Sequence, residues 1–113
     1  MKKSNLPVLI VVMMLACSAA LAQSDTLYIR TSAQCGTCKK KLERDMSFEK
    51  GIKKVSLDLD TKELMVVFHP SKTDPSLLRK AVTAIGYDAD SLAAQPEAYE
   101  RLPSCCKRGG HGH

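Results

Sequence analysis

Five cysteines in a chain of 113 residues are the side chains best suited to chemistry. Cys35 and Cys38 are separated by two residues in the segment Cys35-Gly36-Thr37-Cys38. Thiolates at this spacing can face one soft metal ion, each sulfur about 2.3 Å from it. The alternatives are a structural disulfide and a redox-active dithiol pair. A disulfide here closes only a very short loop and adds little stability, so a purely structural role is not favoured.

A second group of metal-ligand side chains lies at the carboxyl end, where Cys105 and Cys106 are followed by His111 and His113. This composition suits Cu(I), Zn(II) or a similar ion, but its spacing matches no zinc-ribbon or zinc-finger pattern. We predict a second, weaker metal site that cooperates with the first in transfer. The alternative is a disordered basic tail whose cysteines are oxidised or idle.

The amino terminus has the pattern of an export signal. Two lysines precede an apolar run over residues 6–16, and the Ala-Leu-Ala sequence of residues 20–22 precedes Gln23. We therefore predict a signal peptide over 1–22 and a periplasmic protein. A lipoprotein anchored through Cys17 is the alternative, although Met and Leu match poorly in its cleavage box. No other stretch is apolar enough for a membrane helix, so we expect no integral membrane span in the mature chain.

Composition excludes several function classes. The length leaves room for one small domain, which excludes a multidomain enzyme. Seventeen Lys and Arg against twelve Asp and Glu give a formal charge of +5. The basic residues are spread along the chain, and with no Trp and few Phe and Tyr, nucleic acid is not an expected partner. The one lysine run, 39–41, is interpreted as a solvated helix face, with docking of an acidic partner as the alternative.

Hydrophobic periodicity divides residues 25–91 into strands and helices. Alternating polarity predicts strands, whereas apolar residues three or four apart, such as Cys38, Leu42 and Met46, predict amphipathic helices. The predicted elements are a strand at 27–30, a helix at 38–46, strands at 54–59 and 64–69 with a turn at 60–62, a helix at 75–85, and a short strand at 87–91.

Local signals support the second helix. Asp74 followed by Pro75 is typical of a helix start, and Gly86 can adopt the positive φ that ends a helix. A short helix at 96–102, with Tyr99 and Leu102 against the domain, is expected within the tail, residues 92–113.

The element order predicts an α+β, ferredoxin-like βαββαβ fold: an antiparallel four-stranded sheet with both helices on one face. In this plan Cys35 and Cys38 lie near the Gly86-Tyr87 turn. The start of the first helix carries partial positive charge, which favours the thiolate of Cys38. Gly36 leaves backbone room for a partner's ligand to approach.

Residues 25–91 resemble a heavy-metal-associated domain, the module of copper chaperones, of the amino-terminal domains of copper-transporting ATPases and of the periplasmic mercury-binding protein. The family pattern G-M-x-C-x-x-C corresponds here to residues 32–38, and both cysteines match. Ala33 stands where the family has Met, so we expect a less well packed, more mobile loop or an altered metal preference, and an Ala33→Met change would add stability. The resemblance places Tyr87 beside the metal as a second-shell residue.

This resemblance implies a protein that binds a soft metal ion and hands it over by thiolate exchange, not an enzyme. Cu(I) is preferred because a histidine-containing tail suits copper, with Hg(II) or Zn(II) as alternatives. The expected partner is a metal-transporting membrane protein or another metal-binding domain, and we expect a monomer. The alternative functions are a periplasmic mercuric-ion binding protein of a mercury transport system and a thiol-disulfide exchange protein. No Trp precedes Cys35 and no Pro stands at a suitable facing position, which disfavours thiol-disulfide exchange.

Overall fold

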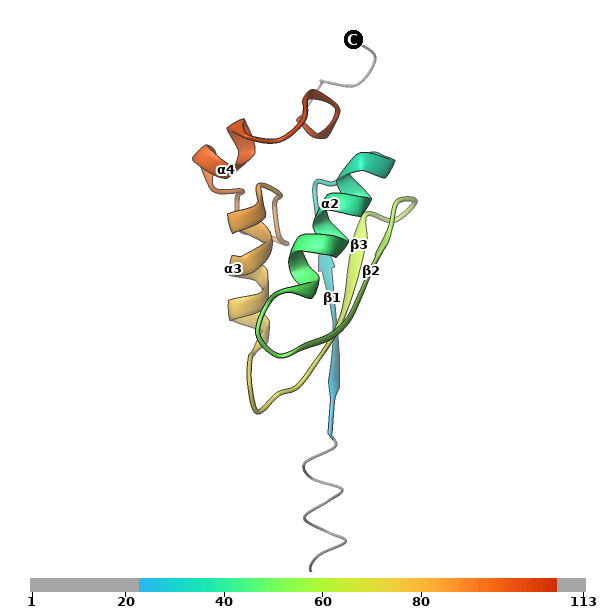
Figure 1. Ribbon diagram of the computed structural model, residues 1–113, viewed down its shortest axis with the longest axis vertical. Helices are drawn as coiled ribbons and strands as arrows, with labels where there is room; N and C mark the ends of the chain where they lie inside the picture. The colour runs from blue at the N-terminus through green and yellow to red at the C-terminus, as the bar shows by residue number, and fades with distance from the viewer. Residues whose placement is uncertain (1–22, 108–113) are drawn as a thin grey trace, which may run out of the picture.

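The computed structural model describes residues 23–107 (Figure 1). The predicted signal peptide 1–22 with Cys17, and the predicted ligands His111 and His113, lie outside the described residues. The elements in chain order are β1 (Asp25–Arg30), α2 (Gly36–Ser47), β2 (Ile52–Asp58), β3 (Glu63–Phe68), α3 (Pro75–Ile85), α4 (Pro96–Glu100) and the 3-10 helix η2 (Ser104–Cys106).

The sheet is antiparallel with strand order β1-β3-β2, so β3 is the central strand. Alternate side chains of β3 are buried, as the polarity pattern predicts. Leu64 of β3 pairs with Ile29 of β1 on one side and with Leu57 of β2 on the other. This row of buried side chains crosses the sheet, and the hairpin predicted for β2 and β3 is confirmed.

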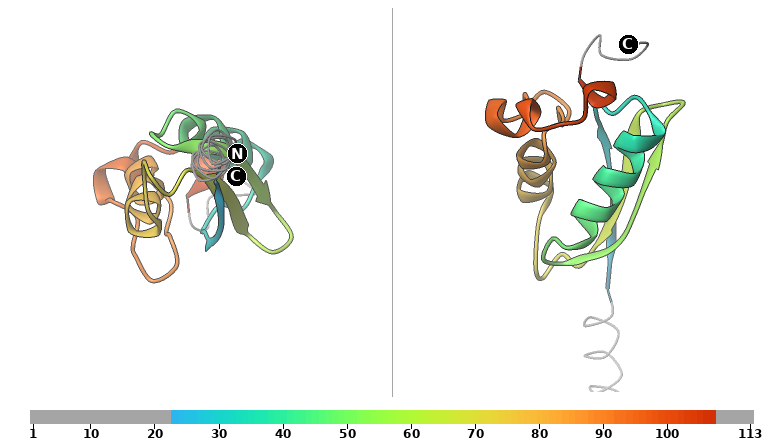
Figure 2. Two further views of the ribbon diagram at one scale, coloured as in Figure 1. Left: turned by 90° about the horizontal axis from the view of Figure 1, so that it is seen from below. Right: turned by 45° about the horizontal axis from the view of Figure 1, so that its top comes forward.

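Both main helices form where the periodicity predicts them. The α2 stripe of Cys38, Leu42 and Met46 is fully buried, and α2 packs against β2 and beside α3 (Figure 2). The Asp74 carboxylate caps α3 by accepting a hydrogen bond from the Leu77 amide at 2.9 Å.

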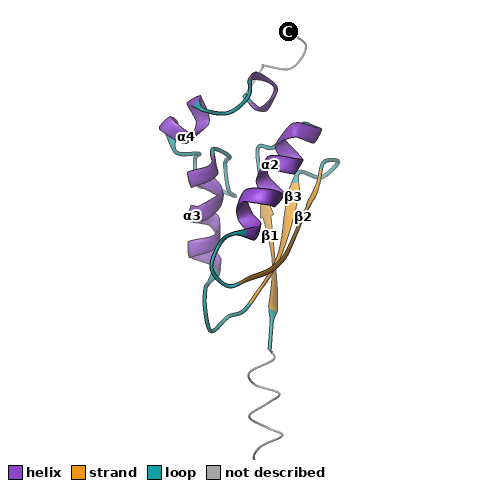
Figure 3. Ribbon diagram, viewed as in Figure 1, coloured by secondary structure: helices purple, strands orange, loops and turns teal. Residues whose placement is uncertain are grey.

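The predicted fourth strand is wrong. In place of a strand over 87–91, the structure has a single bridge between Thr31 and Ala89 (Figure 3). Asp90 has φ 52° and turns the chain back, so that Ala89 also pairs with Leu92. One main-chain bond remains, from the Asp90 amide to the Arg30 carbonyl oxygen at 2.8 Å, and the Arg30 amide instead donates to the Asp90 side chain, at Oδ1, at 3.0 Å. The α+β class is confirmed, but the described part of the chain has a three-stranded sheet.

The carboxyl-terminal segment folds back onto the domain. The short helix predicted near 96–102 is present as α4, and Ala98 and Leu102 are buried. Gly86, with φ 122°, permits the close approach: a Cβ there would lie 2.9 Å from the Ala98 carbonyl oxygen and 3.0 Å from Leu102 side-chain atoms. Between residues 23 and 107 no helix combines the length and apolarity needed to cross a membrane.

Candidate metal centre

The first two thiols lie at the start of α2. Cys35 is the N-cap residue, with extended backbone, and its Sγ accepts a hydrogen bond from the Cys38 amide at 3.4 Å. This local bond brings the two side chains together, and their sulfurs are 2.9 Å apart. A Cβ added at Gly36 would meet no atom within 4 Å, so the backbone between the cysteines is open, as the sequence predicted.

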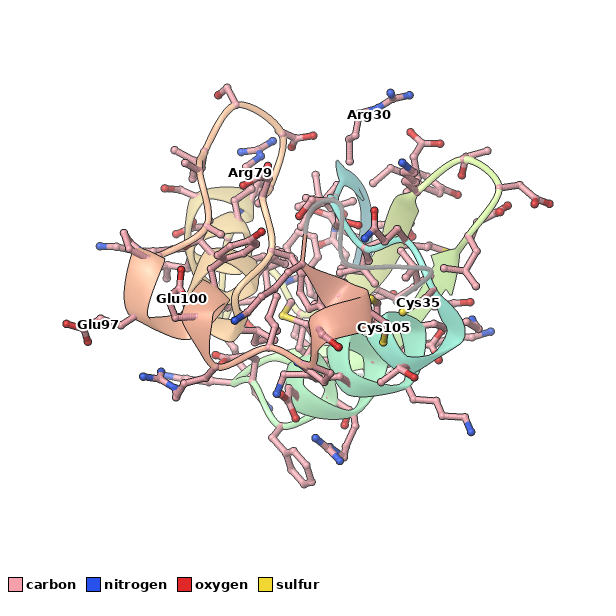
Figure 4. The ribbon with its side chains drawn as sticks, turned by 90° about the horizontal axis from the view of Figure 1, so that it is seen from above. Arg30, Cys35, Arg79, Glu97, Glu100 and Cys105 are labelled. Atoms are coloured by element: carbon pink, nitrogen blue, oxygen red, sulfur yellow. The ribbon has the colours of Figure 1, made fainter. Side chains whose placement is uncertain are left out.

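Two further thiols reach this point from the far end of the chain (Figure 4). Cys105 Sγ lies 3.5 Å from Cys35 Sγ. Cys106 Sγ lies 3.8 Å from Cys35 Sγ and 2.6 Å from Cys38 Sγ. All four cysteines are free thiols. Cys105 and Cys106 thus lie at the first pair, whereas His111 and His113, the other ligands predicted for a second site, lie outside the described residues.

Polar and apolar contacts hold this carboxyl-terminal turn. The side-chain amide of Gln34 donates to the carbonyl oxygens of Cys105 at 3.3 Å and Lys107 at 2.9 Å. Cys106 is only 3% exposed and Leu102 only 5% exposed. The turn is thus fixed on both sides of the vicinal cysteines. Gln34 is a positioning residue that sequence reasoning missed, since nothing in its local sequence indicates a partner 71 residues away.

The pKa values of Cys38 and Cys106 are shifted in opposite directions. Burial alone would raise the pKa of Cys38, but hydrogen bonds with Cys106, with Cys35 and with nearby backbone lower it below its usual value. The pKa of Cys106 is raised by burial and by its hydrogen bond with Cys38. Cys38 is therefore the more readily deprotonated thiol of the two. A thiolate is the form that ligates a soft metal ion.

The heavy-metal-associated domain model matches residues 32–88, about half of the chain. The protein belongs to this family. The matched segment contains Cys35 and Cys38 but ends before the vicinal pair Cys105 and Cys106. Cys35 and Cys38 thus belong to the family segment, whereas Cys105 and Cys106 belong to the segment that follows it.

Curated relatives of this heavy-metal-associated domain are parts of larger proteins. A copper-exporting P-type ATPase of Staphylococcus haemolyticus is 27% identical over 71 residues, which are 63% of this chain and 9% of the ATPase. One from Staphylococcus epidermidis is 28% identical over 57 residues, which are 50% of this chain and 7% of the ATPase. The chain therefore spans less than a tenth of the length of these relatives.

Solved structures show the same fold. Oxidized MerP from Ralstonia metallidurans CH34 matches with a TM-score of 0.57 and 25% identity, covering 60% of this chain and 96% of MerP. The CopZ metallochaperone matches with a TM-score of 0.55 and 23% identity, covering 57% of this chain and 98% of CopZ.

Tyr87 lies where the resemblance to heavy-metal-associated domains places it, next to the thiols. The side chain is fully buried, and its hydroxyl has no hydrogen-bond partner of acceptable geometry among the described residues. Burial raises the pKa of Tyr87, and the nearby Cys106 and Cys38 raise it further. The hydroxyl thus stays protonated beside two sulfurs and is available as a donor.

Ala33 stands where the family pattern has Met. It is fully buried and belongs to the same hydrophobic cluster as Tyr87, Leu102 and Cys106. Its amide donates to Thr31 Oγ1 at 3.3 Å. The Ala33 side chain is therefore part of the buried core.

Two residues of the lysine run have partners on the helix itself. Lys39 Nζ lies 2.6 Å from Glu43 Oε2, and Lys41 Nζ lies 3.1 Å from Asp45 Oδ2. Lys39 also donates to the Leu57 carbonyl oxygen at 2.7 Å, so it helps to join α2 to β2. These contacts favour the structural interpretation of the run over a docking surface.

Proposed function

We propose that this protein is an exported carrier of a soft metal ion, with Cu(I) as its cargo. In this proposal Cys35 and Cys38 hold the ion and release it to a metal-transporting membrane protein or to another metal-binding domain. The observation that carries the proposal is the position of both thiols at the start of α2, 2.9 Å apart and beside an open Gly36 backbone. The chain works by ligand exchange and turns over no substrate.

The exchange needs no change in oxidation state. A thiolate of the receiving protein approaches over Gly36 and forms a bond to the ion, and a metal–sulfur bond to Cys35 or Cys38 then breaks. Each bond that forms replaces one that is lost, so the ion always has ligands. The lowered pKa of Cys38 favours the loaded state, because less free energy is needed to deprotonate this thiol before it binds.

Copper is supported by the curated relatives, which are copper-exporting ATPases over the region of similarity. Mercury is the second candidate cargo, supported by the 25% identity with MerP over 60% of the chain and by the solved mercury-bound form of MerP. Cu(I) and Hg(II) both prefer thiolate ligands, so the cysteine pair suits either ion. Export and a periplasmic location, predicted from residues 1–22, are part of the proposal.

A transfer assay tests this function. The reduced protein is loaded with Cu(I) without oxygen and mixed with the amino-terminal domain of a copper-exporting ATPase. The two proteins are then separated and their copper measured. We expect copper to appear on the acceptor. The Thr37→Ser variant, which keeps both thiols, should behave like the parent, whereas Cys35→Ser/Cys38→Ser should deliver no copper through this route.

The same preparation separates a metal carrier from a thiol-disulfide exchange protein. The reduced protein is incubated with insulin, and precipitation of the reduced insulin chains is followed. We expect no acceleration over buffer. Catalysed insulin reduction without copper transfer would favour the redox function instead.

A further inference from the structure

Because four thiols from two distant segments meet at one point, we propose that Cys105 and Cys106 complete the metal site. The cargo ion is then held in a closed centre of at least three thiolates, and residues 96–107 form its cover. This inference rests on the proposed function, and it names both the coordination of the cargo and the step that controls its release.

The sulfur separations favour this coordination. For metal–sulfur bonds of about 2.3 Å, two ligands on opposite sides of an ion lie about 4.6 Å apart, whereas three or four ligands lie about 3.8 to 4.0 Å apart. Cys35 Sγ lies 3.5 Å from Cys105 Sγ and 3.8 Å from Cys106 Sγ. All three sulfurs lie within 4.8 Å of one another. These three thiols can therefore bind one ion after only small movements of their side chains.

Cys38 is the natural fourth ligand. Its sulfur lies 2.6 Å from Cys106 Sγ and 2.9 Å from Cys35 Sγ, closer than two ligands of one ion lie to each other. An entering soft ion replaces the thiol protons, with one proton released for each thiol that becomes a ligand. The sulfurs then move apart by about 1 Å to reach bonding distance of the ion.

Contacts with the rest of the domain hold residues 96–107 over the thiols. Gln34 donates to two carbonyl oxygens of the turn, at 3.3 and 2.9 Å, and Leu102 packs closely over Gly86. Beneath the turn, the buried hydroxyl of Tyr87 lacks a hydrogen-bond partner among the described groups. A thiolate sulfur of a loaded centre would accept that hydrogen bond. Tyr87 thus places a buried donor beside the same sulfurs.

Release is therefore a competition between ligands. Cys105 and Cys106 are tethered to the domain, so their effective concentration at the ion is far above that of a free thiol. A receiving protein must displace them, one metal–sulfur bond forming as another breaks, before it can take the ion. The segment thus limits loss of the ion to small thiols.

X-ray absorption at the copper edge tests the ligand count. The full chain is reduced, loaded with one equivalent of Cu(I) without oxygen, and compared with Cys105→Ser/Cys106→Ser. The matched control is Ser104→Ala, an exposed change in the same turn. We expect three or more sulfur ligands in the parent and control but two in the double variant. Loss of copper to glutathione should be about tenfold faster in the double variant.

A second measurement needs no variant, because Cys106 is buried and its replacement could undock the turn. Thiol alkylation by iodoacetamide is followed by mass spectrometry with and without one equivalent of Cu(I). We expect the ion to protect both partly exposed thiols, Cys105 as well as Cys35. Protection of Cys35 without protection of Cys105, together with two sulfur ligands in the parent, would overturn the closed centre and leave the proposed function intact. A parent that retains no Cu(I) would overturn both.

Discussion

Cys38 Sγ lies 2.6 Å from Cys106 Sγ, although the two residues are 68 positions apart in the chain. One thiol belongs to the matched family segment and the other to the segment after it. Both are buried, so the contact is part of the core as well as of the candidate site. Changes that loosen the carboxyl-terminal segment should therefore affect metal retention and stability together.

The two glycines near the site provide a matched pair of substitutions. Gly86→Ala should destabilise the protein by about 1 to 3 kcal/mol, because Gly86 has φ 122° and its Cβ would lie 2.9 Å from the Ala98 carbonyl oxygen. Gly36→Ala is the control, since its Cβ would meet nothing within 4 Å. Urea unfolding measures both free energies of unfolding. Equal effects of the two changes would contradict the docking of α4 over Gly86.

The Tyr87 hydroxyl should matter more in the loaded protein than in the ion-free protein. Tyr87→Phe removes a buried hydroxyl without a hydrogen-bond partner, so the ion-free protein should keep or gain stability, by about 1 kcal/mol. The affinity for Cu(I) should fall severalfold, because a donor to a thiolate sulfur is lost. Thermal unfolding without metal and chelator competition with Cu(I) measure the two effects. A clear loss of ion-free stability with unchanged affinity would show that the hydroxyl has another role.

Ala33→Met should destabilise the protein, contrary to the expectation from the family pattern. Ala33 is fully buried in the cluster that contains Leu102 and Cys106, so a longer side chain must displace its neighbours. We expect a loss of about 1 to 3 kcal/mol in the free energy of unfolding. Ala84→Met, at an exposed position of α3, is the control. A gain in stability would mean that the loop has unfilled space after all.

The Glu43 carboxylate should make the free energy of unfolding fall as the pH becomes acidic. Burial would raise its pKa, but Lys39 and the Leu57 amide, 2.6 and 2.8 Å from the carboxylate, lower it below its usual value. A lowered folded pKa means that the stabilisation is fully present above the unfolded pKa and is lost as the pH falls through the folded pKa. Its size should be about 1 kcal/mol, since the side chain is 28% exposed.

Unfolding free energies from neutral pH to pH 3 measure this effect. Glu43→Gln should lower stability at neutral pH and reduce the loss on acidification. Glu49→Gln, an exposed change near the end of the same helix, is the control. An identical pH profile for the Glu43 variant and the parent would contradict the role assigned to this carboxylate.

Most elements of the fold could be predicted because their signals are local. The α2 stripe of Cys38, Leu42 and Met46 and the Asp74 cap of α3 depend on residues within a few positions of one another. The absence of a fourth strand has no such local signal. Residues 87–91 alternate adequately, but side chains such as Asp90 bond to the edge of β1 and the chain turns back there.

One part of the candidate site could be predicted from the sequence, because only that part depends on a local signal. Cys35 and Cys38 are close because a helix start places them so, and their spacing alone indicates this. The position of Cys105 and Cys106 depends on distant contacts, namely Gln34 with the turn and Leu102 over Gly86. No local pattern reports such contacts, so the sequence indicated thiol side chains in both segments without indicating that they lie together.

Mass spectrometry under nondenaturing conditions tests the central claim most directly. Reduced parent and Cys35→Ser/Cys38→Ser are each given one equivalent of Cu(I) without oxygen, in the presence of a competing chelator. The proposed function predicts one retained copper ion in the parent and none in the double variant, with Thr37→Ser equal to the parent. A double variant that retains copper as strongly as the parent would contradict the assignment of Cys35 and Cys38 as the metal site.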